Sequence, residues 1–486
     1  MGLFERGPLG RAVARVGRWS GLLSLAVAVG CATNPVTGKR ELSLVSESQE
    51  IAMGQQGAAE VRQSMGVVND DALRQYVKTI GLRMAKASER PDLPWDFDIV
   101  DDPAINAFAL PGGSIFFTRG ILGFMQNEAE LAAVLGHEIG HVTAKHSVQQ
   151  LSRAQLATGL LGVGSILSSE VAAVAGIASQ GLGILFLKYG RDAETQADDL
   201  GFKYSLSQGY DVRAMRTMFE MLGRVSGASS GGKLPEWLST HPDPENRVAK
   251  TDQRLAATTA DLSKARLNRD EFIQKLDGLV FGVNPRQGYF EEQRFYHPDL
   301  AFRLDFPSGW QTQNQASAVV GLSPNQDAIF ALSIPSKDAP ATALNAFIGQ
   351  QGIQAANATN TSINGLPAAA ADFQAQTQSG VVAGRIAYVS YGGNTYQLLG
   401  YTPAQSFSAY RNLLQATIQS FGRLTDRAAL DKKPNRIRIV RITKDMTVQE
   451  FARQYPSAVS LEAVAMINGV SSPTDVIKAG YAKRVE

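Results

Sequence analysis

The strongest constraint on this chain is the motif H-E-x-x-H at residues 137–141. The stretch from residue 128 to 145 is rich in alanine and leucine and contains no proline, so we expect a helix there. Side chains four residues apart lie on one face of a helix, so His137 and His141 can point at one metal ion. Glu138 would then stand beside the open coordination position. The motif predicts a hydrolytic site with one Zn²⁺ per chain.

A second motif supplies a candidate third ligand, which zinc in catalytic sites usually has in addition to a water molecule. Residues 191–198, R-D-A-E-T-Q-A-D, predict another helix with Glu194 and Asp198 on one face. Glu194 would complete a His-His-Glu set, and Asp198 could accept the outer N–H of a ligand imidazole and fix its tautomer. Without the first motif, these two acids would be interpreted as solvated residues on a surface helix.

A third motif contains the fourth of only five histidines, His241, and has the form H-P-x-x-x-x-R with Arg247 at its end. The order H-E-x-x-H, E-x-x-A-D, H-P-x-x-x-x-R resembles the zinc endopeptidase family that includes HtpX and the CAAX prenyl endopeptidases. Residues 106–120, N-A-F-A-L-P-G-G followed after one residue by I-F-F-T-R-G, resemble that family's edge strand beside the cleft. The resemblance covers roughly residues 34–253 and implies a mainly α, zincin-type (α+β) gluzincin domain.

The resemblance also implies a role for each matching residue. From the chemistry alone, zinc lowers the pKa of a bound water, and Glu138 can take its proton and pass it to the leaving amine. His241 or Arg247 could stabilise the oxyanion; His241 could instead be a latch on the fourth zinc position, or make a structural hydrogen bond in a proline-rich turn. The implied assignments are metal ligands His137, His141 and Glu194; general base Glu138; support to a ligand Asp198; accessory catalytic residues His241 and Arg247; and substrate strand Asn106, Ala107, Phe108 and Ala109.

The amino terminus predicts export. Four arginines precede an apolar run at residues 22–29, which is too short to cross a bilayer and is typical of a secretory signal. Cys31, the only cysteine, follows the small residue Gly30 and resembles the lipid-attachment cysteine of bacterial lipoproteins. We expect a signal peptide at 1–30 and a lipid anchor on Cys31, with Ala32 resembling lipoproteins sorted to the outer membrane. The alternative is an ordinary signal peptide that leaves a free thiol.

The charge of the chain excludes a nucleic-acid-binding protein. The formal net charge is +2, but residues 1–30 carry four arginines and one glutamate, so the mature chain is about −1. No basic block with interleaved aromatic residues occurs. The length of 486 residues and the ordinary composition, 44% hydrophobic and 19% charged, predict a globular protein of several domains.

The segment between Arg153 and Lys188 carries a single charge, Glu170, and is rich in Gly, Ala, Leu and Ser. Glu170 and a Ser-Ser pair divide it into halves too short to span a membrane. We expect a helical hairpin between the two ligand helices, either buried in the core or lying over the cleft as an apolar lid. An exposed face could alternatively touch lipid or unfolded proteins.

The rest of the chain predicts two accessory domains. Residues 255–279 read as helical, and alternating strands follow from residue 297 through 328–334 and 385–399, with helices near 341–351 and 406–420. The run F-P-S-G-W at 306–310 resembles PsbP-like domains, which bind partners. The order strand, helix, helix, strand after residue 437 resembles a LysM module, which binds N-acetylglucosamine polymers such as peptidoglycan; protein docking is the alternative. The expected boundaries are 31–275 for the metallopeptidase domain, 276–295 for a linker, 296–424 for the α+β PsbP-like domain, 425–436 for a linker and 437–486 for the LysM-like βααβ module.

The sequence thus predicts a multidomain zinc metalloendopeptidase, lipid-anchored in the bacterial periplasm at the outer membrane. The expected substrates, misfolded or stalled envelope proteins, rest on the resemblance, and peptidoglycan is an expected partner of the last module. One alternative is a chaperone-like lipoprotein with a latched, largely inactive metal site. Another is a cell-wall tether whose peptidase domain is secondary. The intact Glu138 argues against a dead enzyme.

Overall fold

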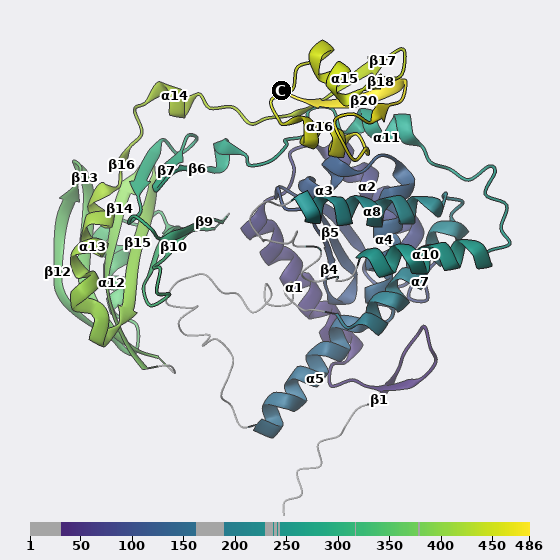
Figure 1. Ribbon diagram of the computed structural model, residues 1–486. Coiled ribbons are helices and arrows are strands. Elements are labelled where there is room, and N and C mark those ends of the chain that lie inside the picture. Colours follow the sequence, from purple (N-terminus) through teal and green to yellow (C-terminus); the bar gives the residue numbers. More distant parts are fainter. Residues whose placement is uncertain are drawn as a thin grey trace, which may run out of the picture.

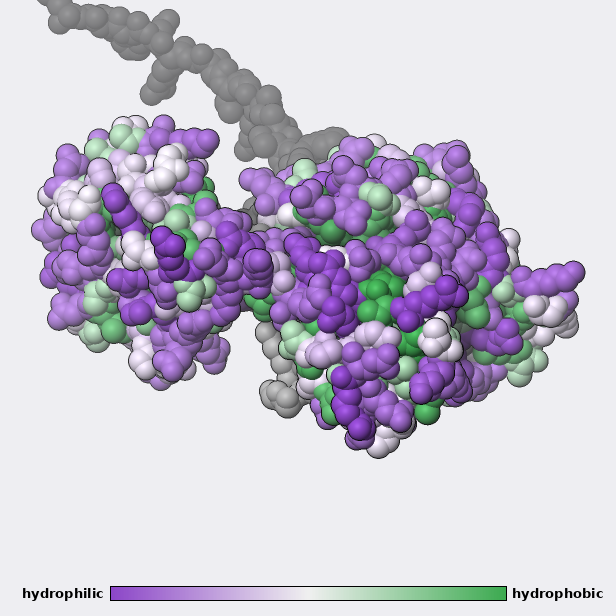
Figure 2. Space-filling model, turned by 90° about the horizontal axis from the view of Figure 1, so that it is seen from above, coloured by the Kyte–Doolittle hydropathy of each residue, from purple (hydrophilic) through white to green (hydrophobic). Residues whose placement is uncertain are grey.

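The computed structural model describes residues 31–161, 189–228, 237, 241, 244–315, 317–377 and 380–486. The expected signal peptide and most of the hairpin expected between residues 153 and 188 lie outside the described residues. Three parts follow one another along the chain: a mainly helical unit, a unit built on a large sheet, and a small carboxy-terminal module (Figure 1). Seen from above, the first two units form separate lobes joined by a narrow neck (Figure 2).

The first unit surrounds a helix that is buried along its whole length. This helix, α4 (Glu128–Thr143), begins at Asn127, whose side chain accepts a hydrogen bond from the backbone N–H of Glu130. All sixteen of its residues are buried, as expected of a helix with apolar residues on every side. The other elements of this unit are β1 Cys31–Thr33, β2 Arg40–Leu42, α1 Glu47–Met65, α2 Asp71–Ala85, β3 Asp96–Val100, β4 Ala107–Ala109, η1 Pro111–Gly113, β5 Ser114–Thr118, α3 Arg119–Phe124, α5 His146–Leu161, α7 Arg191–Ser207, α8 Arg213–Ala228, α10 Pro244–Ala257 and α11 Arg269–Lys275.

The helix expected over residues 255–279 is wrong in its middle. Helix α10 ends at Ala257 and α11 begins only at Arg269. Between them Arg266 pairs with Tyr210 as a parallel bridge, and its backbone N–H donates to Gly209 O at 2.9 Å. This pairing with the segment after α7 holds the chain extended, so tertiary contacts override the local helix propensity.

The second unit is an antiparallel seven-stranded sheet in the order β12-β13-β14-β15-β11-β10-β9, with a four-stranded sheet β16-β8-β7-β6 beside it. The strand region expected at 385–399 contains parts of two strands, β14 and β15, because Gly392 and Gly393, both with positive φ (60° and 81°), turn the chain into a hairpin there. Its elements are η3 Pro285–Gln287, β6 Tyr289–Glu291, β7 Arg294–His297, β8 Phe302–Asp305, β9 Gln311–Asn314, β10 Ala318–Leu322, β11 Ile329–Ser336, α12 Pro340–Ile348, β12 Ile353–Ile363, β13 Leu366–Thr377, β14 Gly380–Tyr391, β15 Asn394–Pro403, η4 Ala404–Ser406, α13 Phe407–Ser420, β16 Gly422–Arg423 and α14 Arg427–Leu430.

Regular structure extends into both expected linkers. Strand β6 lies within residues 276–295 and pairs with β7, and α14 lies within residues 425–436. The segment that leads from the first unit into the second lies beside the segment that leads out of the second unit. Phe281 N–H donates to Asn435 O and Ile437 N–H donates to Leu279 O, each at 2.8 Å. The segments on either side of the second unit are therefore paired with each other.

The carboxy-terminal module packs onto the first unit. Ile437, Ile467 and Val485 belong to the same hydrophobic core as α4. The side chain of Lys483 is fully buried and donates hydrogen bonds to two carbonyl oxygens of the first unit, Gly123 O at 2.9 Å and Met125 O at 2.7 Å. The module has the expected order of two outer strands around two helices: β17 Ile437–Ile442, β18 Met446–Thr447, α15 Val448–Gln454, α16 Leu461–Ile467, β19 Val476–Ile477 and β20 Gly480–Val485, with β17 paired to β20.

A search of the described helices finds none with the length and apolar character needed to span a membrane.

Candidate metal centre

The two ligand helices meet through small residues. A Cβ atom on Gly201 of α7 would lie 2.9 Å from the backbone nitrogen of His137, and one on Gly140 of α4 would lie 3.1 Å from Ala197 O. Any side chain at these positions would push the helices apart. The glycines therefore bring the H-E-x-x-H turn of α4 against the first turns of α7, where Glu194 lies.

Four buried side chains converge where these helices meet. His137 Nε2 and His141 Nε2 are 3.0 Å apart, and the Glu194 carboxylate lies 3.7 Å from the first and 3.5 Å from the second. His241 completes the group, in which one ligand atom of each residue lies within 4.8 Å of the others. The sequence predicted all four residues, and the structure brings them together.

Hydrogen bonds of the two Nδ1 atoms set the tautomers of His137 and His141. The Nδ1 atom of His137 lies 2.9 Å from Asp198 Oδ1, which can only accept, so this nitrogen carries the proton. His141 Nδ1 faces His146 Nδ1 at 2.9 Å, and His146 Nε2 faces Gln196 Oε1 at 2.9 Å. Gln196 Oε1 accepts the proton of His146 Nε2, so His146 Nδ1 is unprotonated and accepts a hydrogen bond from His141 Nδ1. Both ligand histidines then direct an Nε2 lone pair at the same point.

This arrangement fits a cation. Two imidazole lone pairs 3.0 Å apart repel each other unless a positive charge lies between them. Both oxygens of Glu194 and Oε1 of Glu138 are buried without a hydrogen-bond partner among the described residues. Burial raises the pKa of Glu194 to about 8 and that of Glu138 well above its usual range, and it lowers the pKa of His137 to about 4. The residues present form a donor set that a divalent cation would satisfy.

Arg247 supports the candidate metal centre through its contact with Asp198. Its Nη2 and Nε donate to the two oxygens of Asp198 at 2.6 and 3.0 Å, and its guanidinium lies 4.1 Å from the ring centre of Phe219. Burial alone would raise the pKa of Asp198, but Arg247 and His137 outweigh it and hold the pKa well below the usual range. Two nitrogens of Arg247 therefore hold Asp198 in position, while its Nη1 lies 3.5 Å from Glu194 Oε2, and the role of oxyanion donor considered from the sequence stays a prediction.

His241 lies beside Trp237 and Glu138 in the group. Its ring stacks on Trp237 with centroids 4.1 Å apart, and its backbone N–H donates to Trp237 O at 2.7 Å. His241 Nε2 lies 3.8 Å from Glu138 Oε1. The backbone N–H of Trp237 donates in turn to Ile105 O at 3.3 Å, next to the predicted substrate strand. His241 therefore shares the space where Glu138 would act.

The predicted substrate strand lies at the edge of a small sheet. In the order β3-β5-β4, strand β4 pairs antiparallel with β5 on one side only. Residues 107–109 are buried, with Asn106 just before them. The edge position agrees with the family resemblance, while the substrate role of Asn106, Ala107, Phe108 and Ala109 stays a prediction.

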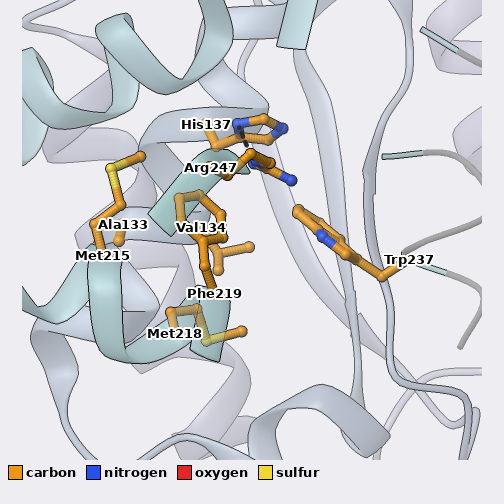
Figure 3. Close-up of a pocket in the computed structure, with 8 residues that line it drawn as sticks. All are labelled: Ala133, Val134, His137, Met215, Met218, Phe219, Trp237 and Arg247. Carbon is orange, nitrogen blue, oxygen red and sulfur yellow. Dashed lines mark hydrogen bonds between the residues drawn. The ribbon is translucent and has the colours of Figure 1, made fainter. Parts of the chain in front are cut away.

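An apolar recess adjoins the metal-binding group. Figure 3 shows Trp237 and Arg247 beside the His137 ring, with the α8 side chains facing them across the recess. The lining residues are Ala133, Val134, His137, Met215, Met218, Phe219, Trp237 and Arg247. The recess places an apolar surface directly beside one of the candidate ligands.

Sequence reasoning missed several supporting residues. Lys145, with a φ of 59°, ends α4 with a left-handed turn that brings His146 back against His141. Tyr189 stacks on the His141 ring at 4.1 Å, and its hydroxyl hydrogen-bonds to Ser147 at 2.8 Å. The signal for His146 was present, because a third histidine five residues after the motif is unusual in a chain with five. Nothing in the sequence marked Tyr189.

Comparison with known proteins identifies the first unit. The model of peptidase family M48 matches residues 71–255. The first unit therefore carries a domain of peptidase family M48. It is 31% identical over 246 residues to the beta-barrel assembly-enhancing protease of Escherichia coli K12, covering 48% of this chain and 49% of that protein. It is 31% identical over 227 residues to the mitochondrial metalloendopeptidase OMA1 of Schizosaccharomyces pombe, covering 46% of this chain and 65% of that protein.

The matches cover only part of either protein, since the chain spans about half the length of the bacterial relatives. A third relative, the beta-barrel assembly-enhancing protease of Yersinia pestis, is 32% identical over 45% of this chain and 46% of its own length. Among solved structures, a cyanobacterial PsbP from Synechocystis aligns with 27% of this chain and 91% of its own, at 15% identity and a TM-score of 0.23. The PsbP-like and LysM-like assignments of residues 296–424 and 437–486 stay predictions.

Proposed function

We propose that this protein is a zinc-dependent endopeptidase. The observation that carries the proposal is the convergence of His137, His141 and Glu194 at one buried point, with Glu138 one residue after the first ligand. A Zn²⁺ ion held there supplies a Lewis acid for a peptide carbonyl and lowers the pKa of a water molecule. Three protein ligands and an open fourth position are the usual arrangement of catalytic zinc.

In this proposal Glu138 is the general base. Its Oε1 is buried, is free of hydrogen bonds to described residues and faces the side of the group where His241 lies. It accepts the proton of the attacking water and later passes it to the leaving amine. Asp198 and Arg247 keep the proton of His137 on Nδ1, so that its Nε2 stays available to the metal.

We further propose that His241 is a latch on the fourth position. The support is its membership of the four-residue group within 4.8 Å, together with its stacking on Trp237, which fixes the ring close to Glu138. A neutral imidazole is a good zinc ligand and would exclude the attacking water until substrate displaces it. The competing assignment is stabilisation of the oxyanion from the same place.

The two roles of His241 predict opposite changes in the peptidase activity of His241→Ala. If His241 is a latch, His241→Ala raises peptidase activity. If it stabilises the oxyanion, the same variant loses about 2.7 to 4 kcal/mol of transition-state binding, which is measured as a fall in kcat/KM. Unchanged turnover and unchanged zinc affinity would exclude both roles and leave His241 as a structural residue of its turn.

The proposed substrates are misfolded or stalled proteins of the bacterial envelope. Support comes from the names of the bacterial relatives, which describe proteases that enhance β-barrel assembly. The proposed location is the periplasmic face of the outer membrane, with a lipid on Cys31, and the proposed partner of the last module is peptidoglycan. These assignments follow from the signal-like amino terminus and the two module resemblances.

The test compares two kinds of variant by zinc content and casein degradation. Glu138→Gln should keep about one zinc per chain and lose proteolysis by about 10² to 10⁴-fold, because it moves protons without holding the ion. His137→Ala and Glu194→Ala should lose the metal itself. Wild-type cleavage by Glu138→Gln would refute the mechanism.

A second candidate function is a chaperone-like lipoprotein with a largely inactive, latched metal centre. The position of His241 within the ligand group is the observation that favours it. In that case the wild type would hold zinc and bind unfolded proteins without cleaving casein. Cleavage of casein by the wild type would favour the endopeptidase.

A further inference from the structure

The long outer strand of the seven-stranded sheet is open on one side. Strand β12 is eleven residues long, and among the described strands it pairs only with β13. Residues 354–362 are all exposed, so neither face of the strand is covered by the helices α12 and α13. In Figure 1 it forms the edge of the sheet farthest from the first unit. About half of its backbone N–H and C=O groups point away from β13, as in any edge strand.

This edge lacks the charges that usually protect such strands. Residues 339–371 contain no Asp, Glu, Lys or Arg in 33 positions, whereas the 19% average of the chain would give about six. Edge strands of natural proteins are commonly blunted by lysines, prolines or bulges. Of these devices β12 has only a bulge between Ala356 and Thr359, where Asn357 takes a φ of 56°. The stretch from Thr359 to Ile363 is regular, exposed in its first four residues and free of charge.

The opposite edge of the same sheet is short and covered. Strand β9 has four residues, and the side chain of Asn314 donates to Gln287 O at 3.1 Å and to Gly288 O at 2.9 Å. The chain that enters the sheet from the first unit thus caps this side. Among the described strands of this sheet, only β12 combines length with an open edge.

The scaffold behind β12 is firmly tied. Asp372 of β13 accepts hydrogen bonds from Arg385 of β14 at 2.7 Å, Arg411 of α13 at 2.8 Å and Asn357 of the bulge at 2.9 Å. This buried carboxylate therefore links the bulge of β12 to two neighbouring elements. An added strand would meet a preformed backbone template, which lowers the ordering cost of binding.

We propose that β12 captures an extended, uncharged segment of a client polypeptide as an eighth strand of the sheet. Main-chain hydrogen bonds supply the affinity in this mode of recognition. The side chains of residues 355–362 of β12 are small and neutral (Ala, Asn, Thr, Ser), so this part of the edge offers no ion-pair partner to a bound strand. A charged strand would desolvate its charges without compensation, whereas a neutral strand of an unassembled β-sheet protein matches. The proposal rests on the proposed function, which supplies such clients to the peptidase unit.

The test measures binding of a labelled strand peptide to the full chain carrying Glu138→Gln, which prevents cleavage of the probe. The probe is a capped ten-residue peptide of alternating Thr and Val, and its control carries N-methyl groups on alternate residues. Thr359→Lys/Thr361→Lys places two charges on the exposed edge, and Gln376→Lys places one on an exposed position of the inner strand β13. We expect at least a tenfold rise in the probe's Kd for the double variant and less than a twofold change for Gln376→Lys.

Each outcome decides the matter. Equal binding of the N-methylated probe, or of the unmodified probe to the double variant, overturns the proposal. Self-association of the chain that is lost in the double variant, without probe binding, assigns the edge to pairing between copies instead. In the active protein, the double variant should cleave a short peptide normally and an unfolded β-rich protein more slowly. If the probe binds and neither substrate is cleaved, the docking strand stands and the endopeptidase proposal fails.

Discussion

The buried lysine that joins the last module to the first unit should make the stability of the protein depend on pH. The Lys483 side chain lies in the core contact, with its Nζ on the carbonyls of Gly123 and Met125. Burial lowers the pKa of Lys483 from 10.5 to about 7, although the charge of Glu130 acts in the opposite direction. Glu130 itself accepts from Gln126 N at 2.7 Å and Thr217 Oγ1 at 2.8 Å, at the start of the metal-binding helix.

The sign of the effect follows from proton uptake. Between pH 7 and 10 the unfolded chain holds a proton on this lysine that the folded protein has lost, so the free energy of unfolding rises with pH. A depression of the pKa from 10.5 to about 7 corresponds to roughly 5 kcal/mol in total. Of this, roughly 3 kcal/mol should be recovered between about pH 6 and about pH 9, the rest lying at higher pH.

The assay is urea unfolding at about pH 6 and about pH 9, followed by the fluorescence of the buried Trp95 and Trp237 in a Trp310→Phe background. Lys483→Met keeps the length of the side chain and removes the titrating group. Lys478→Met, at a position 78% exposed in the side chain, controls for the loss of a lysine. The wild type and Lys478→Met should gain roughly 3 kcal/mol more across this range than Lys483→Met. Parallel pH dependence of all three proteins would refute the coupling between burial and protonation argued here.

The remaining predictions concern packing, metal support and anchoring. Gly201→Ala should cost about 1–3 kcal/mol in urea unfolding by separating the two helices, whereas Gly190→Ala, whose Cβ would meet no described atom within 4 Å, should cost less. Arg247→Lys loses the two-pronged contact with Asp198 and should weaken zinc affinity by about 10 to 100-fold in a chelator competition; unchanged affinity would contradict the positioning role. Cys31→Ala should abolish fatty-acid labelling and release the protein from membranes, and an unmodified thiol on the mature wild type would exclude the lipid anchor.

The candidate metal-binding group was predictable because its geometry is local. The spacing of His137 and His141 is one helical turn, and the same holds for Glu194 and Asp198. Helical periodicity therefore fixes each pair before any tertiary contact forms. What the sequence does not encode locally is the approach of the two helices, which depends on Gly136 of α4 meeting Gly201 of α7 and on Gly140 meeting Ala197.

The parts that sequence reasoning missed depend on distant contacts. Residues 255–279 have helical composition, but the pairing of Arg266 with Tyr210 competes successfully with the helix. The burial of Lys483 against α3 has no signature in its own segment, because a lysine in an amphipathic strand is normally exposed. The contact between Arg247 and Asp198 was missed for a similar reason: the sequence assigned Asp198 to His137 alone, and the sharing of this carboxylate depends on tertiary contacts.

The two ligand histidines of the helix are oriented by different chemistry. His137 is backed by a charged chain, in which Arg247 holds Asp198 and Asp198 holds the ring. His141 is backed by a neutral chain through His146 to Gln196. A carboxylate strengthens the basicity of the imidazole that it accepts from, whereas a neutral partner mainly fixes its orientation. In the proposed zinc centre, His137 would therefore be the ligand that the third motif, H-P-x-x-x-x-R, supports: Arg247 at its end holds Asp198 against the His137 ring, while His241 at its start lies 3.8 Å from Glu138.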